Sequence, residues 1–440
     1  MRLERAQLGW LAALAATISV SIFAAETALV LAILTSGVLL ARGRMRLERT
    51  ALDAPLFAFA VWTLLSASFA ADPARAHADS KKLLLFVLFY LAAAGLAAPG
   101  RRERVLAALF LGGLALSALM VIQYHLLGHQ GLDERPRGFL GHWMSASGVA
   151  MGVLVAAAAR LAFGPRTALR LRDGWLPALL LAGVGLVAAL ESQGAGVLPR
   201  RLFVGVLALG GAAVVLAEGA PVRAAREALA WVVVPVCGWA VLVSQTRNAW
   251  LGALCGLTVV AVLRRPRLLW VPAAAAAAIL LLRPAVVTTR LTLHDESSVD
   301  RYYMWQAGLD MLLDKPVFGQ GPGMILTAYP RYRWPEAPNP TTPHLHNNVL
   351  QLAAERGVPA LVFFVWWAAV ALGAALSEAR RAREPPHDAW VAVASFAGLV
   401  AILVAGLFEY NLGDSEVLML GLLLTSLPFA LRRERAATAL

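Results

Sequence analysis

The stretch "VLVSQTRNAWLGAL", residues 241–254, decides the fold class of this 440-residue chain. One apolar run ends in it, three polar residues and Arg247 follow, and a second apolar run begins almost at once. Runs of about 20 apolar residues are long enough to cross the hydrocarbon core of a bilayer as helices. The stretch therefore predicts a tight turn between two membrane helices, with Arg247 at the membrane surface.

The composition supports the same class over the whole chain. Hydrophobic residues make up 59% of the sequence and charged residues only 15%, a balance typical of a polytopic membrane protein. The net charge of +12 comes from short Lys and Arg clusters between apolar runs, where such clusters orient helices, so we expect no nucleic-acid partner. Cys237 and Cys255 lie inside apolar runs without a CxxC pattern and predict neither a disulfide nor a zinc site.

Apolar runs long enough to span a membrane occur along the whole chain. The clearest are residues 52–71, 83–99, 104–127, 144–163, 228–244, 248–264, 268–283, 358–377, 388–408 and 414–431. Two pairs of shorter runs, 8–24 with 27–42 and 175–191 with 201–217, can each form two spans or one span with a re-entrant piece. We predict an all-α membrane protein with 12 to 14 transmembrane helices and a single membrane domain over residues 1–440.

The orientation follows from the basic clusters, which mark cytoplasmic loops. They fall on one side of the membrane if both termini are cytoplasmic, and comprise Arg42/Arg44/Arg46/Arg49, Arg101/Arg102/Arg104, Arg166/Arg170/Arg172, Arg223/Arg226, Arg264/Arg265/Arg267, Arg380/Arg381/Arg383 and Arg432/Arg433/Arg435. The opposite side then receives the loops around Lys81, Arg137, Arg247 and Glu409 and one long connection, residues 284–357. A loop of that length in a compact protein is usually functional.

The long loop contains signals for two helices. From Ser298, "SVDRYYMWQAGLDMLLDKP" has apolar residues at helical spacing and places Arg301, Trp305 and Gly308 on one face. The run "GQGPG", residues 319–323, lacks the strand and the lysine of a phosphate loop and predicts a turn. A second helix is predicted in "TTPHLHNNVLQLAAERGVP", residues 341–359, from its N-terminal Thr341, Thr342 and Pro343, its C-cap Gly357 and the following Pro359.

Two histidines, His344 and His346, stand at the start of this second helix. The positive end of the helix dipole disfavours an imidazolium there, so a ring is kept neutral and can act as a base. One alternative is a histidine that only hydrogen-bonds to loop backbone. Another is a metal site, but no third ligand lies at a useful spacing, so we predict no metal and no cofactor.

Cations at the outer ends of spans run against the usual charge bias and need an explanation. They are Arg247, Arg301, Lys81 and Lys82. Each alone can be a side chain that reaches from the bilayer to the interface. A lipid-linked pyrophosphate at the membrane surface would explain them together, because an arginine fork binds two phosphate oxygens at once.

Three motifs in order carry a family resemblance. These are "SQTRNAWLGAL", "DRYYMWQAGLDMLLDKPVFGQGPG" and "HLHNNVLQLAAERGVPA", and an earlier segment, "RPRGFLGHWMSASGVAM", is compatible with them. On them the chain, over roughly residues 240–410, resembles the O-antigen ligase and O-antigen polymerase superfamily of bacterial inner-membrane glycosyltransferases. The resemblance implies a C-type glycosyltransferase fold, an undecaprenyl-pyrophosphate-linked glycan as donor, and a reaction without metal or nucleotide.

The resemblance also implies residue roles. His346, directly before an asparagine, matches the essential histidine of the family, and Arg247 and Arg301 match its key arginines. Lys81 or Lys82 and Arg137 are further expected contacts to the substrate. The bottom-up chemistry agrees, since His346 can deprotonate an acceptor hydroxyl while the cations stabilise the leaving diphosphate.

Within the superfamily, three activities fit the sequence. They are an O-antigen ligase that uses lipid A-core as acceptor, a polymerase and a protein O-oligosaccharyltransferase. We favour the ligase, with its site facing the periplasm of a bacterial inner membrane, because the chain is short and has one dominant outer loop. A flippase or transporter is the alternative from another class, but it would carry ionisable residues at mid-membrane depth, and these spans are almost free of charge.

Overall fold

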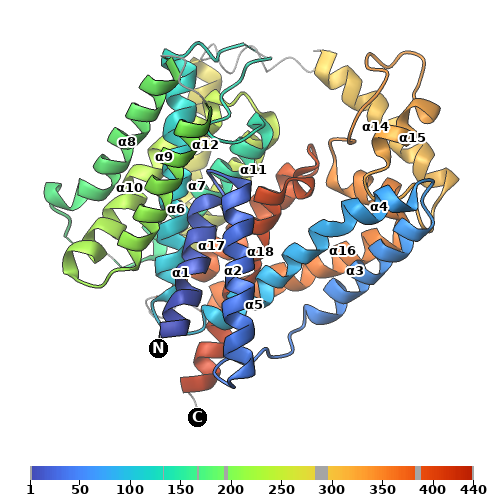
Figure 1. Cartoon of the computed structure of the whole chain (residues 1–440). Coiled ribbons are helices and arrows are strands. Elements are labelled where there is room, and N and C mark those ends of the chain that lie inside the picture. Colours follow the sequence, from blue (N-terminus) through green and yellow to red (C-terminus); the bar gives the residue numbers. More distant parts are fainter. Residues whose placement is uncertain are drawn as a thin grey trace.

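The computed structural model describes residues 2–131, 133–165, 168–192, 197–282, 296–381 and 388–438, and within these ranges it contains helices and no strands. A central bundle of seven of the described helices forms the middle of the fold (Figure 1). These are α1 (Arg2–Thr17), α6 (Arg101–Leu126), α7 (Trp143–Phe163), α10 (Ala220–Val243), α11 (Arg247–Arg264), α17 (Ala389–Ala405) and α18 (Ser415–Thr438). The helices pack closely, since a Cβ added at Gly112 of α6 would lie 2.0 Å from the carbonyl oxygen of Ala16 in α1.

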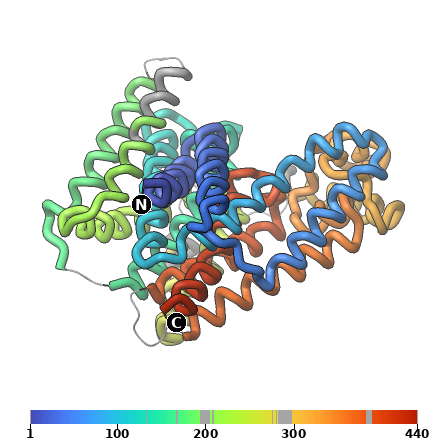
Figure 2. Tube along the Cα trace, turned by 60° about the horizontal axis from the view of Figure 1, so that its bottom comes forward, coloured from blue at the N-terminus to red at the C-terminus, as the bar shows by residue number. Residues whose placement is uncertain are grey.

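Further helices cover the bundle or extend from it. The cover consists of α2 (Ile22–Ala41), α5 (Val87–Gly95), α8 (Trp175–Ser192), α9 (Val197–Leu216) and α12 (Trp270–Leu282). In Figure 2, α3 (Asp53–Ser68) and α16 (Asn348–Arg381) run side by side away from the bundle. They reach α4 (Pro73–Asp79), α14 (Glu296–Asp314) and α15 (Ile325–Tyr332), and 3-10 segments lie at Ser80–Phe86, Leu171–Gly174, Pro266–Leu269 and Asn411–Gly413.

The apolar runs predicted from the sequence all coincide with helices. By length and composition, seven of the described helices can cross a membrane, which fits a multi-pass membrane protein. The predicted turn at Arg247 is confirmed, because α10 ends at Val243 and α11 begins at Arg247, and the indole of Trp250 donates to the Val241 carbonyl across the turn (2.8 Å). The total of 12 to 14 spans and the C-type glycosyltransferase fold stay predictions.

The long loop agrees with its prediction only in part. Helix α14 covers the run from Ser298, and Gly357 has the positive φ (75°) expected of a C-cap, with the next helical stretch following it. The second loop helix was placed too early, because α16 begins at Asn348 and not directly after Pro343. The first part of the loop, residues 284–295, lies outside the described residues, as do Arg166 and Arg383 of the basic clusters.

The two ends of the bundle differ in their polar residues. We call the end with α14 and α15 the site end, and the opposite end, where both termini lie, the arginine-rich end (Figure 1). At the latter, the fully buried guanidinium of Arg102 binds Asp388 (2.5 Å) and Glu434, and so ties α6 and α18 to the residue preceding α17. The buried guanidinium needs such partners, because an unpaired charge is costly away from water.

Candidate functional site

The backbone around His346 is not helical. His346 has a φ of +51°, and Asn347 caps α16, its Oδ1 accepting from the amide of Leu350 (3.0 Å). The predicted cap at Thr341, Thr342 and Pro343 is wrong. The physical reason is the full burial of Leu345, whose amide donates to Gln351 Oε1 (2.7 Å), so the chain makes one more turn before the helix starts.

A glutamate from a distant loop faces His346. The Nδ1 atom of His346 lies 2.8 Å from Oε2 and 3.0 Å from Oε1 of Glu409, which is only 4% exposed. The loop between α17 and α18 is fixed by Asn348, whose backbone amide donates to the Gly406 carbonyl (2.7 Å) and whose side chain donates to Asn411 (2.7 Å). The cap of α16 therefore aligns the histidine and the carboxylate.

The electrostatics of this pair favour an ionised glutamate. Burial alone would raise the pKa of Glu409, but the hydrogen bond and charge of His346, with His344 and Arg301 nearby, hold that pKa below its ordinary value. An ionised carboxylate accepts a hydrogen bond from Nδ1–H of His346, and in the tautomer that carries its proton on Nδ1 the Nε2 atom is free to accept one. The arrangement thus orients a histidine as a base.

His344 lies much closer to His346 than a helical arrangement predicts. Two helical residues at this spacing would point about 200° apart, but neither histidine is helical, so that geometry does not apply. The ring centroids are 4.3 Å apart, and Nδ1 of His344 lies 3.8 Å from Oε1 of Glu409. Burial lowers the pKa of His344 to about 4, so its ring is neutral.

The three side chains also form a possible ligand set for a metal ion. One ligand atom each from His344, His346 and Glu409 lie within 4.8 Å of one another. The sequence shows no third ligand at a useful spacing from the two histidines, but the fold brings Glu409 to them from 63 residues beyond His346. The absence of a third ligand is therefore a wrong premise for excluding a metal. Two histidines and a glutamate suit zinc.

Both predicted arginines line one cavity beside this pair. The cavity has a volume of about 300 Å³ and is lined by Arg247, Asn248, Leu251, Ser298, Arg301, Tyr302, Trp305 and Phe408. Arg247 Nη2 donates to Ser298 Oγ (2.9 Å), while Arg301 Nη2 lies 3.7 Å from Glu409 Oε2. His346 does not line the cavity, so Arg301 and Phe408 are the link between the two.

The face of α14 that carries Arg301 is the one predicted. The indole of Trp305 donates to the Leu345 carbonyl (3.0 Å), and a Cβ added at Gly308 would lie 2.7 Å from Leu345 Cδ1. Since residues 301, 305 and 308 share a helix face, this packing fixes α14 against the segment that leads to His346.

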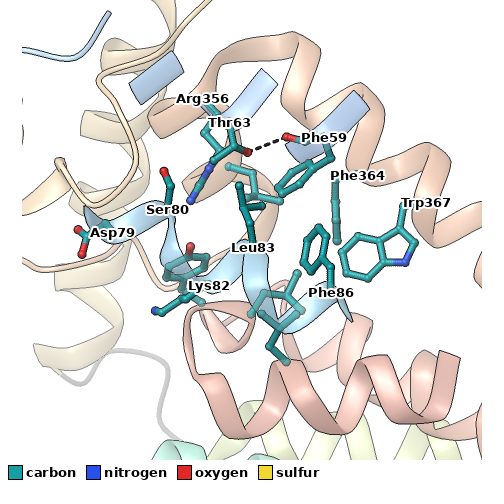
Figure 3. A pocket seen from close by; sticks show the side chains of 14 residues that line it. Phe59, Thr63, Asp79, Ser80, Lys82, Leu83, Phe86, Arg356, Phe364 and Trp367 are labelled. Carbon is teal, nitrogen blue, oxygen red and sulfur yellow. Dashed lines mark hydrogen bonds between the residues drawn. The ribbon is translucent and has the colours of Figure 1, made fainter. Parts of the chain in front are cut away.

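The predicted lysines are not brought to this cavity. Lys81 is exposed, and Lys82 lines a separate narrow pocket and donates to the Gly413 carbonyl. Figure 3 shows Lys82 and Asp79 at the rim of that pocket, with Phe86 and Trp367 at the far side. Lys82 is therefore coupled to the site through the loop after α17 and not through a shared cavity with the arginines.

Arg137 is exposed in the loop before α7 and is also absent from the cavity lining. Its backbone amide donates to Gln123 Oε1 (3.0 Å). Its charge nevertheless acts on His142, whose ring caps α7 by accepting from the amide of Met144 (3.2 Å). The pKa of His142 is lowered mainly by burial, and Glu409 and His346 are close enough to influence it.

Two acidic residues in the loop after α17 were missed as site residues. The sequence places Glu409 and Asp414 in a turn between two apolar runs, which is a signal, but nothing in the sequence pairs them with a histidine. Asp414 accepts from Ser145 of α7 (2.9 Å), and burial raises its pKa to about 7. The two carboxyl groups thus have opposite pKa shifts within one loop.

A comparison with family models bears on the relationship of this chain to known proteins. Residues 232–365 match the model of the O-antigen ligase family. This match supports membership of the chain in the O-antigen ligase/polymerase superfamily. Members of this superfamily are glycosyltransferase-like enzymes, and the family suggests lipid-linked polysaccharide substrates. No curated protein matches the chain.

The superfamily match covers part of the site. The matched segment contains Arg247, Arg301 and His346 and ends before Glu409. Lys82 and Arg137 lie upstream of the segment. Glu409 is therefore assigned to the site by the geometry of this chain alone, and the roles of Arg247, Arg301 and His346 stay predictions, although these three residues lie within the matched segment.

Proposed function

We propose that this protein is an O-antigen ligase, which transfers O-antigen from undecaprenyl pyrophosphate to lipid A-core. The observation that carries the proposal is the contact chain from Arg301 through Glu409 to His346, beside a cavity lined by Arg247 and Arg301. It combines an oriented base with cations placed for a diphosphate. The domain organisation in this proposal is a single membrane domain with a periplasmic loop from residue 284 to 357.

The reaction needs one proton transfer and one displacement. His346 takes the proton of an acceptor hydroxyl, and the resulting oxygen attacks the anomeric carbon of the glycan. The bond from that carbon to the pyrophosphate oxygen breaks, and the electron pair leaves with undecaprenyl pyrophosphate. A single displacement inverts the anomeric centre. Glu409 stabilises the imidazolium that forms, because its carboxylate accepts from Nδ1–H.

The arginines act on the leaving group. Negative charge accumulates on the diphosphate as the bond breaks, and preorganised cations stabilise it more in the transition state than in the ground state. Arg247 and Arg301 come from different helices, α11 and α14, and line the same cavity. In this proposal they replace the divalent cation that other transferases use, so no metal and no cofactor takes part.

Other activities share much of this chemistry. A polymerase or a protein O-oligosaccharyltransferase would use the same base and donor with another acceptor, and the site geometry is compatible with each. A flippase needs polar groups along a transmembrane path. The gathering of His344, His346, Glu409 and the two arginines at one end of the bundle favours surface chemistry instead.

Reconstitution tests the proposal directly. The purified protein is mixed with lipid-linked O-antigen and rough lipopolysaccharide in vesicles, and the products are separated by mass. We expect a ladder of higher-mass lipopolysaccharide with wild-type protein and none with His346→Ala. Elongation of the lipid-linked glycan without transfer to lipid A-core would identify a polymerase, and transbilayer movement of the donor without bond formation would identify a flippase.

A further inference from the structure

A second arginine-lined cavity lies at the arginine-rich end, far from the proposed active site. It has a volume of about 270 Å³ and is formed by the loop between α2 and α3, by α5 and by the last turns of α18. Its lining residues are Leu47, Glu48, Arg49, Thr50, Ala51, Tyr90, Ala93, Phe429, Arg432, Arg433 and Ala436. No step of the transfer reaction uses it.

The charge around this cavity is strongly positive. Residues 42–53 and 431–438 together hold seven arginines and three acidic residues, of which Asp53 binds Thr50 at the cavity wall and Glu434 binds Arg102. The Glu378 side chain, which is only 1% exposed, forms ion pairs with both Arg432 (3.0 Å) and Arg435. Glu48 binds Arg433 (3.0 Å), and Arg49 is exposed, without an ion pair in the part of the chain that the structure describes. The carboxylates near the cavity therefore leave positive charge uncompensated.

The walls of the cavity are apolar as well as basic. Phe429 and Ala93 are buried, and Leu47 is 47% exposed. The guanidinium of Arg432 lies over the Phe429 ring, 5.7 Å from its centroid. The cavity lies beside α5 and the end of the candidate membrane span α18, and its arginines above an apolar wall match the charged headgroup and apolar chains of a lipid at the membrane surface.

We propose that this cavity binds the phosphate headgroup of an anionic phospholipid, with the acyl chains against Leu47 and Phe429. Arg433 is held by Glu48 and by the carbonyl of Arg46 (2.6 Å), so it is oriented before a ligand arrives. Arg49 and Arg432 complete a basic rim from separate segments. A free inorganic anion would need only the arginines, whereas the apolar wall fits a lipid.

The test measures lipid binding to the full-length protein in neutral detergent. Phosphatidylglycerol, cardiolipin, phosphatidylcholine and inorganic phosphate are added separately, and bound lipid is counted by native mass spectrometry alongside the melting temperature. We expect the two anionic lipids to bind and to stabilise the protein, and phosphatidylcholine and phosphate to do neither. Equal effects of phosphatidylcholine would exclude headgroup recognition, and equal effects of phosphate would reassign the cavity to free anions.

Matched substitutions locate the binding. Since each arginine near an anionic headgroup contributes modestly, Arg49→Gln and Arg433→Gln should each weaken phosphatidylglycerol binding about fivefold. Arg42→Gln is the control, because Arg42 is exposed on the same loop and does not line the cavity. Its affinity should stay within about twofold of wild type. If Arg42→Gln weakens binding as much as Arg49→Gln does, the attraction is diffuse surface charge and the proposed site is wrong. Unchanged affinity in both cavity variants overturns it equally.

Discussion

Two cavities of similar size, about 300 Å³ at the site end and about 270 Å³ at the arginine-rich end, are lined by arginines. They differ in what stands beside the cations. At the site end, Arg301 lies 3.7 Å from a buried glutamate that also binds a histidine. At the other end, Glu48 is exposed and the lining contains no imidazole. Arginines suffice to hold an anion, and a reaction needs a proton acceptor next to them.

The largest expected effect is on the base. His346→Ala should reduce transfer by a factor of about 10² to 10⁴ while leaving donor binding and membrane insertion intact, because the ring acts chiefly in the transition state. Turnover is measured in vesicles with equal amounts of protein. His344→Ala, the matched control, should retain part of the activity. Near-normal transfer by His346→Ala would mean that His346 is not the base of the reaction.

Removal of the carboxylate comes next. Glu409→Gln keeps the size of the side chain but cannot stabilise an imidazolium, so kcat should fall on the order of 10² with little change in KM for the donor. Glu409→Asp should recover part of the rate. A purely structural role for Glu409 would instead lower the melting temperature and change KM and kcat together.

Arg247 in the site cavity should affect donor binding as well as the rate of transfer. Arg247→Ala removes a charged hydrogen-bond donor, and we expect donor affinity to weaken about tenfold to a hundredfold. The measurement is donor binding by the purified protein, and Arg49→Gln at the opposite end is the control. Equal donor affinity in wild type and Arg247→Ala would separate this cavity from the diphosphate.

A smaller effect concerns stability. The pKa of Asp414 is raised to about 7 in the folded protein from an ordinary value of 3.8. Its protonated form is therefore favoured by folding, so stability is lost as pH rises from about 4 to 7. Asp414→Asn should raise the melting temperature at pH 8 by about 1 to 3 °C and should have no such effect at pH 4. An Asn variant that is less stable at pH 8 would show that the ionised form is the one the fold prefers.

The smallest expected effect is that of a chelator. Turnover in EDTA should match turnover without it, because Arg247 and Arg301 are proposed to take the role of a metal at the diphosphate. The cluster of His344, His346 and Glu409 makes this a real test. If a chelator abolishes turnover and zinc or magnesium restores it, the three side chains hold a metal ion, and the assignment of His346 as the general base is wrong.

Much of the fold could be predicted because hydrophobic spacing is a local signal. The apolar runs and the turn at Arg247 depend on neighbouring residues, and the structure places them as expected. The start of α16 could not be predicted in the same way. Thr341, Thr342 and Pro343 have good capping chemistry, yet the burial of Leu345 and the side chain of Asn347 decide where the helix begins. Tertiary packing thus overrides the local preference.

The candidate site shows the same division. Arg301 was placed by helical spacing from Trp305 and Gly308, and these contacts hold. The pairing of His346 with Glu409 joins segments 63 residues apart, and no period or motif links such positions. Lys82 does not reach the cavity of the two arginines, because its side chain donates to the Gly413 carbonyl, a contact between residues 331 positions apart.

His346 adopts a left-handed backbone conformation, with φ at +51°. Glycine would occupy it at no cost, whereas a residue with a Cβ is strained there by about 1 kcal/mol. A glycine at this position would relieve the strain, but it would also take away the imidazole that hydrogen-bonds to the buried Glu409 and that serves as the base in the proposed mechanism. At residue 346, relief of backbone strain therefore favours glycine, whereas the proposed reaction requires histidine.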